Sequence, residues 1–131
     1  MGVELLDERT IELATGKNFA VFTTLRPDGH PAGQVMWIDA DCDHLLINTE
    51  VHRRKFRNVL ADPRVTVTIW QADNPYEYAE IRGVVDEIVR GAPAREHIDR
   101  LAIRYFGRVY DPEEIESERV ILRIRPLSDG P

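Results

Sequence analysis

Alternating hydrophobic and polar residues run through most of this chain and predict strands rather than helices. In residues 64–71, Val65, Val67 and Ile69 occupy one face, and polar or aromatic residues occupy the other. Similar patterns bounded by turn-forming residues predict five more strands, at residues 18–25, 31–39, 44–49, 76–89 and 119–125. Short turns join several of these strands and favour an antiparallel sheet, because parallel strands need long crossovers.

Three segments depart from this alternation and carry hydrophobic residues at helical spacing. They are residues 5–15, 51–62 and 93–106. We therefore predict a mainly β protein, in which six antiparallel strands form a closed or nearly closed barrel with two to three short helices. A chain of 131 residues that is 43% hydrophobic has enough material for one core, so we expect residues 1–131 to form a single domain.

The acidic balance of the chain limits the partners it can bind. There are 23 Asp and Glu residues against 17 Lys and Arg, with a net charge of −6, and nucleic-acid binding needs a broad basic surface instead. The single cysteine, Cys42, excludes an intramolecular disulfide, and no segment reads as a signal peptide or a membrane span. These features predict a cytoplasmic protein without nucleic-acid or membrane partners.

One short basic segment departs from this acidic composition. Arg53, Arg54, Lys55 and Arg57 place four positive charges at the start of the second predicted helix, directly after a strand. A cation at an exposed helix N-terminus costs about 0.3–1 kcal/mol, whereas an anion there is stabilised. Free backbone N–H groups and arginine forks both suit phosphate oxygens, so we interpret the segment as a phosphate-binding site. The alternative is a solvated basic face on a short helix.

Other residues with chemical potential have simpler interpretations. The four histidines lack the spacing of a metal site, so no metal is expected. Trp37 could contact a planar ligand or pack in the core. Tyr105, Phe106 and Tyr110 are expected to pack on the core rather than to form part of a site.

An ordered set of short motifs along the chain resembles the pyridoxamine 5′-phosphate oxidase-like superfamily, the split β-barrel flavin and deazaflavin oxidoreductases. The motifs are Thr23-Thr24-Leu25, Asp28-Gly29, Pro31, Gln34 to Asp39, Asn48-Thr49, Arg53-Arg54-Lys55, Asn58, Pro63-Arg64-Val65 and Trp70. Each motif is short, but their order covers nearly the whole chain. The resemblance implies a homodimer with two cofactor sites at the subunit interface.

The resemblance also implies a role for particular residues. The cofactor phosphate would be held by the basic segment, namely Arg53, Arg54 and Lys55, with Arg57 nearby. The remaining expected contacts are with the ring or the ribityl chain, from Gln34, Val35, Met36, Trp37, Asn48 and Thr49, and from Tyr76 of the facing subunit. No side chain is expected to act as an obligate catalytic acid or base.

Two departures separate this chain from pyridoxamine-phosphate oxidases proper. Gln34 stands where those enzymes usually have arginine, and residues 125–131 lack their terminal arginine and histidine motif. The chain looks more like the actinobacterial subgroup that uses the deazaflavin F420, whose phosphodiester and polyglutamate tail would suit extra arginines.

The resemblance therefore implies an F420-dependent oxidoreductase that transfers a hydride between the deazaflavin and an unidentified small organic substrate. Two alternatives remain open. One is an FMN-dependent oxidase or reductase on the same fold, and the other is a non-catalytic protein that binds F420 or a flavin.

Overall fold

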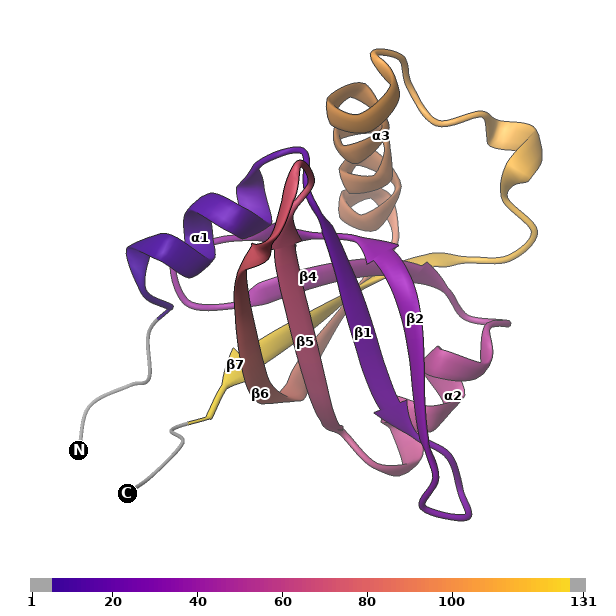
Figure 1. Cartoon of the computed structure of the whole chain (residues 1–131). Helices are drawn as coiled ribbons and strands as arrows, with labels where there is room; N and C mark the ends of the chain where they lie inside the picture. Colours follow the sequence, from indigo (N-terminus) through magenta and orange to yellow (C-terminus); the bar gives the residue numbers. More distant parts are fainter. Residues whose placement is uncertain (1–5, 128–131) are drawn as a thin grey trace.

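The computed structural model describes residues 6–127, in which seven strands form one antiparallel sheet (Figure 1). The strands are β1 (Phe19–Leu25), β2 (Pro31–Trp37), β3 (Asp39–Ala40), β4 (Leu45–Glu50), β5 (Arg64–Gln71), β6 (Asn74–Arg90) and β7 (Arg119–Pro126). The helices are α1 (Glu8–Thr15), α2 (Arg54–Ala61), α3 (Ala92–Phe106) and a 3-10 turn at Pro112–Glu114. The predicted mainly β, split-barrel-like class is confirmed, but the predicted count of six strands is wrong.

The additional strand arises because the expected strand at residues 31–39 is interrupted at Ile38. The Ile38 side chain is fully buried, its N–H donates to the Tyr105 hydroxyl at 3.3 Å, and its carbonyl accepts from Arg104 Nη1 at 2.6 Å. Since these bonds replace the strand ladder, the chain leaves β2 and forms the two-residue β3 against β4. The sheet order β2-β1-β5-β6-β7-β4-β3 makes β2 and β3 its two edges, and the gap between them is the split in the barrel.

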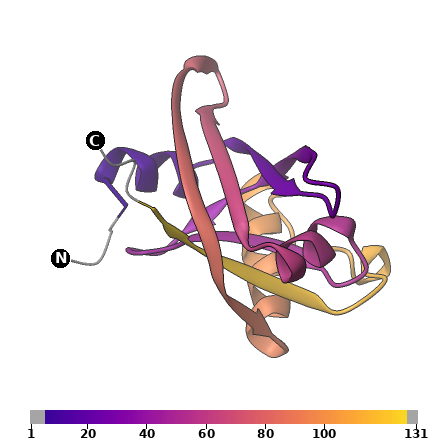
Figure 2. The same ribbon diagram turned by 90° about the horizontal axis from the view of Figure 1, so that it is seen from below.

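The long strand β6 connects the two halves of the sheet. Its first half pairs with β5 and its second half with β7, and the register shifts between Val85 and Glu87. Figure 2 shows β6 running from the β5–β6 hairpin across the molecule toward α3. Gly83 lies where the two pairings meet, and a Cβ atom there would be 2.6 Å from the carbonyl oxygen of Arg125. Glycine is therefore required by the close approach of the backbones.

The hydrophobic core lies inside the curved sheet, and helices close its open sides. Phe22, Ile47, Val67 and Leu122 are among its buried members. The short helix α2 adds Phe56 and Val59 to this core. Within the described residues, no helix is both long and apolar enough to cross a membrane.

The outer face of β2, β1, β5 and β6 has helix over it only at one end, where Tyr105 of α3 packs on Trp37 and Phe19 (Figure 1). Strand register places four aromatic residues side by side across this face, in the order Trp37, Phe19, Trp70 and Tyr78. Most of helix α3 packs on the other half of the sheet, against β7, β6 and β4. One side of the barrel is thus covered by helix, and the other presents bare strands beyond its Trp37–Phe19 end.

Candidate functional site

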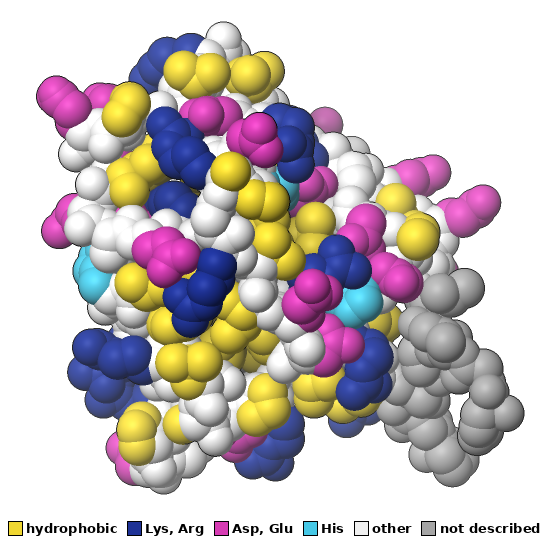
Figure 3. All heavy atoms as spheres, turned by 180° about the vertical axis from the view of Figure 1, so that it is seen from behind, with side chains coloured by type: hydrophobic (Ala, Val, Ile, Leu, Met, Phe, Trp, Pro, Cys, Tyr) yellow, Lys and Arg dark blue, Asp and Glu magenta, His cyan; other side chains and the backbone are white. Residues whose placement is uncertain are grey.

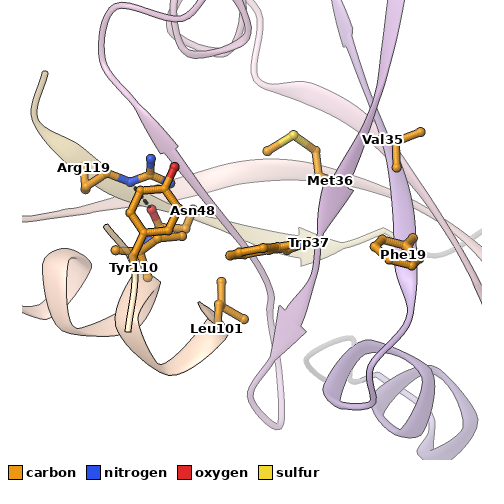
Figure 4. Close-up of a pocket in the computed structure, with 9 residues that line it drawn as sticks. Phe19, Val35, Met36, Trp37, Asn48, Leu101, Tyr110 and Arg119 are labelled. Carbon is orange, nitrogen blue, oxygen red and sulfur yellow. Dashed lines mark hydrogen bonds between the residues drawn. The ribbon is translucent and has the colours of Figure 1, made fainter. Parts of the chain in front are cut away.

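A pocket of about 270 Å³ lies beside the split of the barrel, between β2 and helix α3 (Figure 4). Residues from four strands, one helix and one loop line it, namely Phe19, Val35, Met36, Trp37, Asn48, Ile98, Leu101, Tyr110 and Arg119. These residues span one hundred positions of sequence and meet only because β2, β4 and β7 converge at this end of the sheet.

Aromatic rings form one wall of the pocket. Trp37 stacks on Tyr105 with ring centroids 4.8 Å apart and planes 4° from parallel. Tyr110 meets Trp37 edge-on at 6.3 Å, and Phe106 does so at 5.0 Å. Such packing holds the indole in one orientation. A rigid, largely apolar wall of this kind suits a planar ligand.

A chain of buried hydrogen bonds lies behind the polar side of the pocket. Asn48 Nδ2 donates to the Ala94 carbonyl at 2.9 Å and lies 3.1 Å from His97 Nδ1. The opposite ring nitrogen of His97, which is only 1% exposed, is 2.9 Å from Asp39 Oδ2. Arg104 Nη2 donates to the other oxygen of Asp39 at 2.7 Å. The network fixes Asn48 against α3.

Arg119 provides the positive charge of the pocket. Its Nε donates to Asn48 Oδ1 at 2.8 Å, and its Nη1 donates to Glu50 Oε2 at 3.1 Å. The guanidinium also lies over the Tyr110 ring, 5.2 Å from the centroid. Burial lowers the pKa of Arg119, although Tyr110 and Glu50 favour its charged form.

Glu50 joins this pocket to the loop that follows α3. The carboxylate is 1% exposed and accepts hydrogen bonds from the backbone N–H groups of Glu116 and Ser117, both at 2.7 Å. Burial raises the pKa of Glu50, but these N–H groups and Arg119 outweigh that effect and hold it below its ordinary value. The carboxylate is therefore charged at neutral pH and fixes both the loop and Arg119.

The basic segment lies at the start of α2, as the sequence predicts. Arg53 is the N-cap residue, but its side chain makes no capping bond, and the first turn of the helix has no acidic residue. Arg53, Arg54 and Arg57 are exposed, whereas Lys55 is only 9% exposed. Burial lowers the pKa of Lys55, and the positive charges of Arg53 and Arg119 lower it further.

Lys55 therefore belongs to a cationic cluster that reaches from the start of α2 to Arg119 in the pocket. Among residues 6–127, no carboxylate forms an ion pair with Lys55 or with the three arginines of the basic segment. A buried lysine without a counterion is energetically costly, and an anion bound there would remove the cost.

One face of the molecule carries charges of both signs. On the face seen in Figure 3, basic and acidic side chains are interspersed around exposed hydrophobic ones, so no broad basic surface forms there. The cationic cluster is a local feature.

The structure brings together four of the residues expected to contact the ring, namely Val35, Met36, Trp37 and Asn48. Gln34 is exposed on the edge strand β2 and does not line the pocket. Thr49 is 3% exposed and pairs with Val120 on the inner face of the barrel, because alternate residues of β4 face opposite sides. Tyr76 is 89% exposed near the tip of the β5–β6 hairpin and lines no wall of the pocket in its own chain.

The sequence interpretation missed the remaining lining residues, Arg119 above all. Arg119 begins the closing strand and is paired in register with Glu50, but this pairing joins residues that are far apart in sequence. Tyr110 does pack against the α3 cluster, as expected, and it lines the pocket as well. Helical spacing alone could indicate only the first of these two roles.

A second group of polar side chains lies near the β3–β4 turn, where ligand atoms of Asp41, Asp43 and His44 are within 4.8 Å of one another. Arg123 Nη1 donates to Asp41 Oδ2 at 2.6 Å, and Arg123 Nη2 is 3.0 Å from His44 Nδ1. The guanidinium thus already pairs with this group, and the arrangement is that of a surface ion-pair network.

The fold and the site together define a class of protein: a small split barrel with an aromatic pocket beside a cationic helix start. The chain belongs to the pyridoxamine 5′-phosphate oxidase family, whose family model matches residues 6–128. The predicted resemblance to this family of flavin- and deazaflavin-binding oxidoreductases is thereby confirmed.

Comparison with solved structures agrees with this assignment. An F420 reductase is 33% identical and superposes with a TM-score of 0.81, over 94% of this chain and 97% of that one. General Stress Protein 26 from Bacillus anthracis str. Sterne is 20% identical with a TM-score of 0.66, over 91% of this chain and 87% of that one. HutZ, the heme storage protein from Vibrio cholerae, is 14% identical with a TM-score of 0.63, over 89% of this chain and 87% of that one. The last two share the fold.

Proposed function

We propose that this protein is an F420-dependent oxidoreductase that acts on a small organic substrate. The observation that carries the proposal is the buried, unpaired Lys55, which lies in a cationic cluster next to an aromatic pocket. The 33% identity to an F420 reductase over nearly the full length of both chains supports the choice of cofactor.

The residues present fit such a cofactor on chemical grounds. Lys55 and Arg53 would hold the phosphate together with the backbone N–H groups at the start of α2, which has no side-chain cap. Trp37 and Met36 would contact the ring, and Arg54 and Arg57 are exposed where an acidic tail could reach them. Gln34 and the partner's Tyr76 keep their predicted roles as contacts of the cofactor within a dimer, whereas Thr49 faces the inside of the barrel and does not.

When bound, the reduced deazaflavin would supply a hydride to the substrate, which takes the balancing proton from solvent. The contribution of the chain is to bind, orient and shield. The cationic cluster binds the phosphate, the stacked Trp37 and Tyr105 orient the ring, and the apolar wall from Leu101 and Ile98 excludes water. No side chain has to serve as an acid or base.

Titration of the purified protein with F420 and with FMN, followed by fluorescence, tests the proposal. Lys55→Gln is expected to weaken binding about 10- to 100-fold, because a charge-assisted hydrogen bond contributes about 1.5–3 kcal/mol. Arg100→Gln, on the exposed side of α3, is the matched control and should bind as the wild type does.

The outcomes separate the proposed function from its alternatives. Preference for FMN would favour the flavin enzyme, and tight F420 binding without reduction of any acceptor would favour a cofactor-binding protein. If neither cofactor binds below about 1 mM, which corresponds to about −4 kcal/mol, the proposed function is wrong.

We propose further that the active form is a homodimer with cofactor sites at its interface. The bare face of β2, β1, β5 and β6 supports this arrangement, because Val35 and Tyr78 are 64% and 61% exposed there beside a row of aromatic rings. Exposed hydrophobic faces of this kind usually mark an interaction surface.

A further inference from the structure

The pocket contains few groups that can donate a hydrogen bond to a ligand. Apart from the indole of Trp37, the nitrogen and oxygen groups of its lining side chains belong to Asn48, Tyr110 and Arg119. The internal partners of these side chains therefore decide which of them is available.

The side-chain amide of Asn48 already uses both of its hydrogen-bond donors within the protein. Its Nδ2 has acceptors at Ala94 and His97, at 2.9 and 3.1 Å, and its Oδ1 accepts from Arg119 at 2.8 Å. Since an amide has two donor hydrogens, Asn48 has none left for a ligand. It lies in the pocket wall as a support for its neighbour.

Arg119 is held in place but is not saturated. A guanidinium has five N–H donors; Asn48 and Glu50 take two of them, the Tyr110 hydroxyl is close enough to take a third, and the others remain for a ligand. The side chain is 9% exposed and lies over Tyr110, so its plane is fixed before any ligand arrives. Figure 4 shows Arg119 and Tyr110 together at the end of the pocket opposite Phe19.

The charge around Arg119 is incompletely balanced. Glu50 shares its carboxylate between Arg119 and the two backbone N–H groups of Glu116 and Ser117. Lys55 lies close enough to Arg119 for the two positive charges to repel each other. An acceptor group or a negative charge in the pocket would relieve this imbalance.

We propose that Arg119 is a ligand-binding residue of this pocket, which donates to the oxygen-bearing edge of the planar heterocycle and favours its reduced, anionic form. The inference rests on the proposed function, because it assumes a flavin-like ring with carbonyl oxygens on one edge. A fixed positive charge at that edge binds the reduced form more tightly than the neutral oxidised form, and tighter binding of the reduced form raises the midpoint potential.

The test separates contacts to the ring from contacts to the phosphate by using probes with and without phosphate. Affinities are measured for F420, for its phosphate-free deazaflavin chromophore, for FMN and for riboflavin. Lys55→Gln should weaken only the phosphate-bearing probes, whereas Arg119→Gln should weaken all four by about 10- to 100-fold. Arg119→Lys keeps the charge and should recover part of the loss, and Arg100→Gln should behave as the wild type.

The midpoint potential of the bound cofactor provides a readout that is independent of turnover. If Arg119→Gln removes a tenfold preference for the reduced form, the potential should fall by about 30 mV, the two-electron equivalent of a factor of ten. The double variant Glu50→Gln/Arg119→Gln removes both charges of the pair and controls for misfolding caused by an unpaired Glu50. Thermal melts of both variants verify that the compared proteins are folded.

Unchanged affinity for riboflavin and for the deazaflavin chromophore in folded Arg119→Gln would overturn the inference while leaving the proposed function intact. Weakened binding with an unchanged potential would overturn the part that concerns the anionic form. Failure of the wild type to bind any of the four probes would overturn the proposed function as well as the inference.

Discussion

Lys55 illustrates a conflict between stability and ligand binding at the level of one residue. A charged lysine residue that is 9% exposed, with two like charges nearby, destabilises the protein until an anion binds. Under the proposed function, the phosphate of the cofactor would be that anion.

Replacement of Lys55 by methionine should therefore stabilise the ligand-free protein by up to about 1 kcal/mol while it weakens binding of phosphate ligands. The native pKa lies below the ordinary value of 10.5, so the unfolded chain holds this proton more tightly and the lysine costs stability below that pH. The advantage of Lys55→Met should accordingly shrink as the pH rises from 7 toward 10.5 in urea unfolding. Arg54→Met, at an exposed position, is the control and should change stability by less than about 0.5 kcal/mol. If Lys55→Met instead lowers stability, Lys55 does not destabilise the ligand-free protein.

The charge of Glu50 has the opposite effect on stability from that of Lys55, because it stabilises the folded protein. Burial alone would raise its pKa, but the backbone N–H groups of Ser117 and Glu116 and the charge of Arg119 lower it below 4.5. A carboxyl group with a lowered native pKa stabilises the protein fully above its ordinary value, and this contribution is lost as the pH falls through the native pKa.

Glu50→Gln should thus lower the free energy of unfolding by about 2–4 kcal/mol at pH 7. This loss should become smaller as the pH falls below 4.5. Chemical unfolding of both proteins between pH 3 and 7, a range set by the usual titration of carboxyl groups at about pH 4, measures this difference. The exposed pair of Glu118 with Arg90 serves as the comparison, because Glu118→Gln should cost less than about 1 kcal/mol. A cost for Glu50→Gln that is independent of pH would refute the assignment.

At the level of elements, the position of α2 decides where the basic segment lies. Asn58, on the inner side of this helix, donates from Nδ2 to Thr24 Oγ1 of β1 at 2.9 Å, and both residues are buried. This bond joins the helix that carries Lys55 to the centre of the sheet. Its loss should affect both stability and the alignment of the cationic cluster.

Asn58→Leu should destabilise the protein by about 1–3 kcal/mol, because it leaves the buried Thr24 hydroxyl without its partner. Thr24→Val combined with Asn58→Leu replaces both polar groups by apolar ones of similar shape and should recover most of the loss. Thermal unfolding of the two single variants and the double variant gives the coupling energy. Additive losses, with no recovery, would show that the bond does not anchor the helix.

Local pattern was sufficient to predict most of these elements. Alternation in β5 and the position of Pro63 after α2 depend on neighbouring residues alone, and both agree with the structure. The break at Ile38 could not be predicted, because its causes are Tyr105 and Arg104 on a distant helix. A strand ends there although its hydrophobic pattern continues.

At the level of the whole molecule, α3 covers only the Trp37–Phe19 end of the outer face of β2, β1, β5 and β6, and a second chain of the same kind would cover the remainder in the proposed dimer. The row of aromatic residues from Trp37 to Tyr78 crosses this face next to the pocket. Dimer formation and cofactor binding should therefore depend on each other.

Sedimentation at micromolar concentration should give twice the chain mass of 15.1 kDa. Tyr78→Glu places a charge beside Trp70 on the bare face and should produce monomers with weakened cofactor binding, since a buried unpaired charge costs several kcal/mol. Ile103→Glu changes a hydrophobic residue of similar exposure on α3 and should leave the dimer intact. A wild-type protein that sediments as a monomer would remove the proposed interface.

The sequence by itself determined the class of fold, the positions of the helices and the basic segment at the start of α2. Each of these features depends on residues that are close together in sequence, so periodicity, turn residues and charge are enough to predict it. The motifs along the chain also sufficed to indicate the family.

Only the tertiary structure decided which polar groups share one site. Arg119 reaches Glu50 and Asn48 through strand pairing, and Thr49 faces away from Asn48 because β4 is a strand with two faces. The burial of Lys55 likewise follows from the packing of α2 rather than from its neighbours in sequence. Burial and pairing join residues that are distant along the chain, and no local pattern records them.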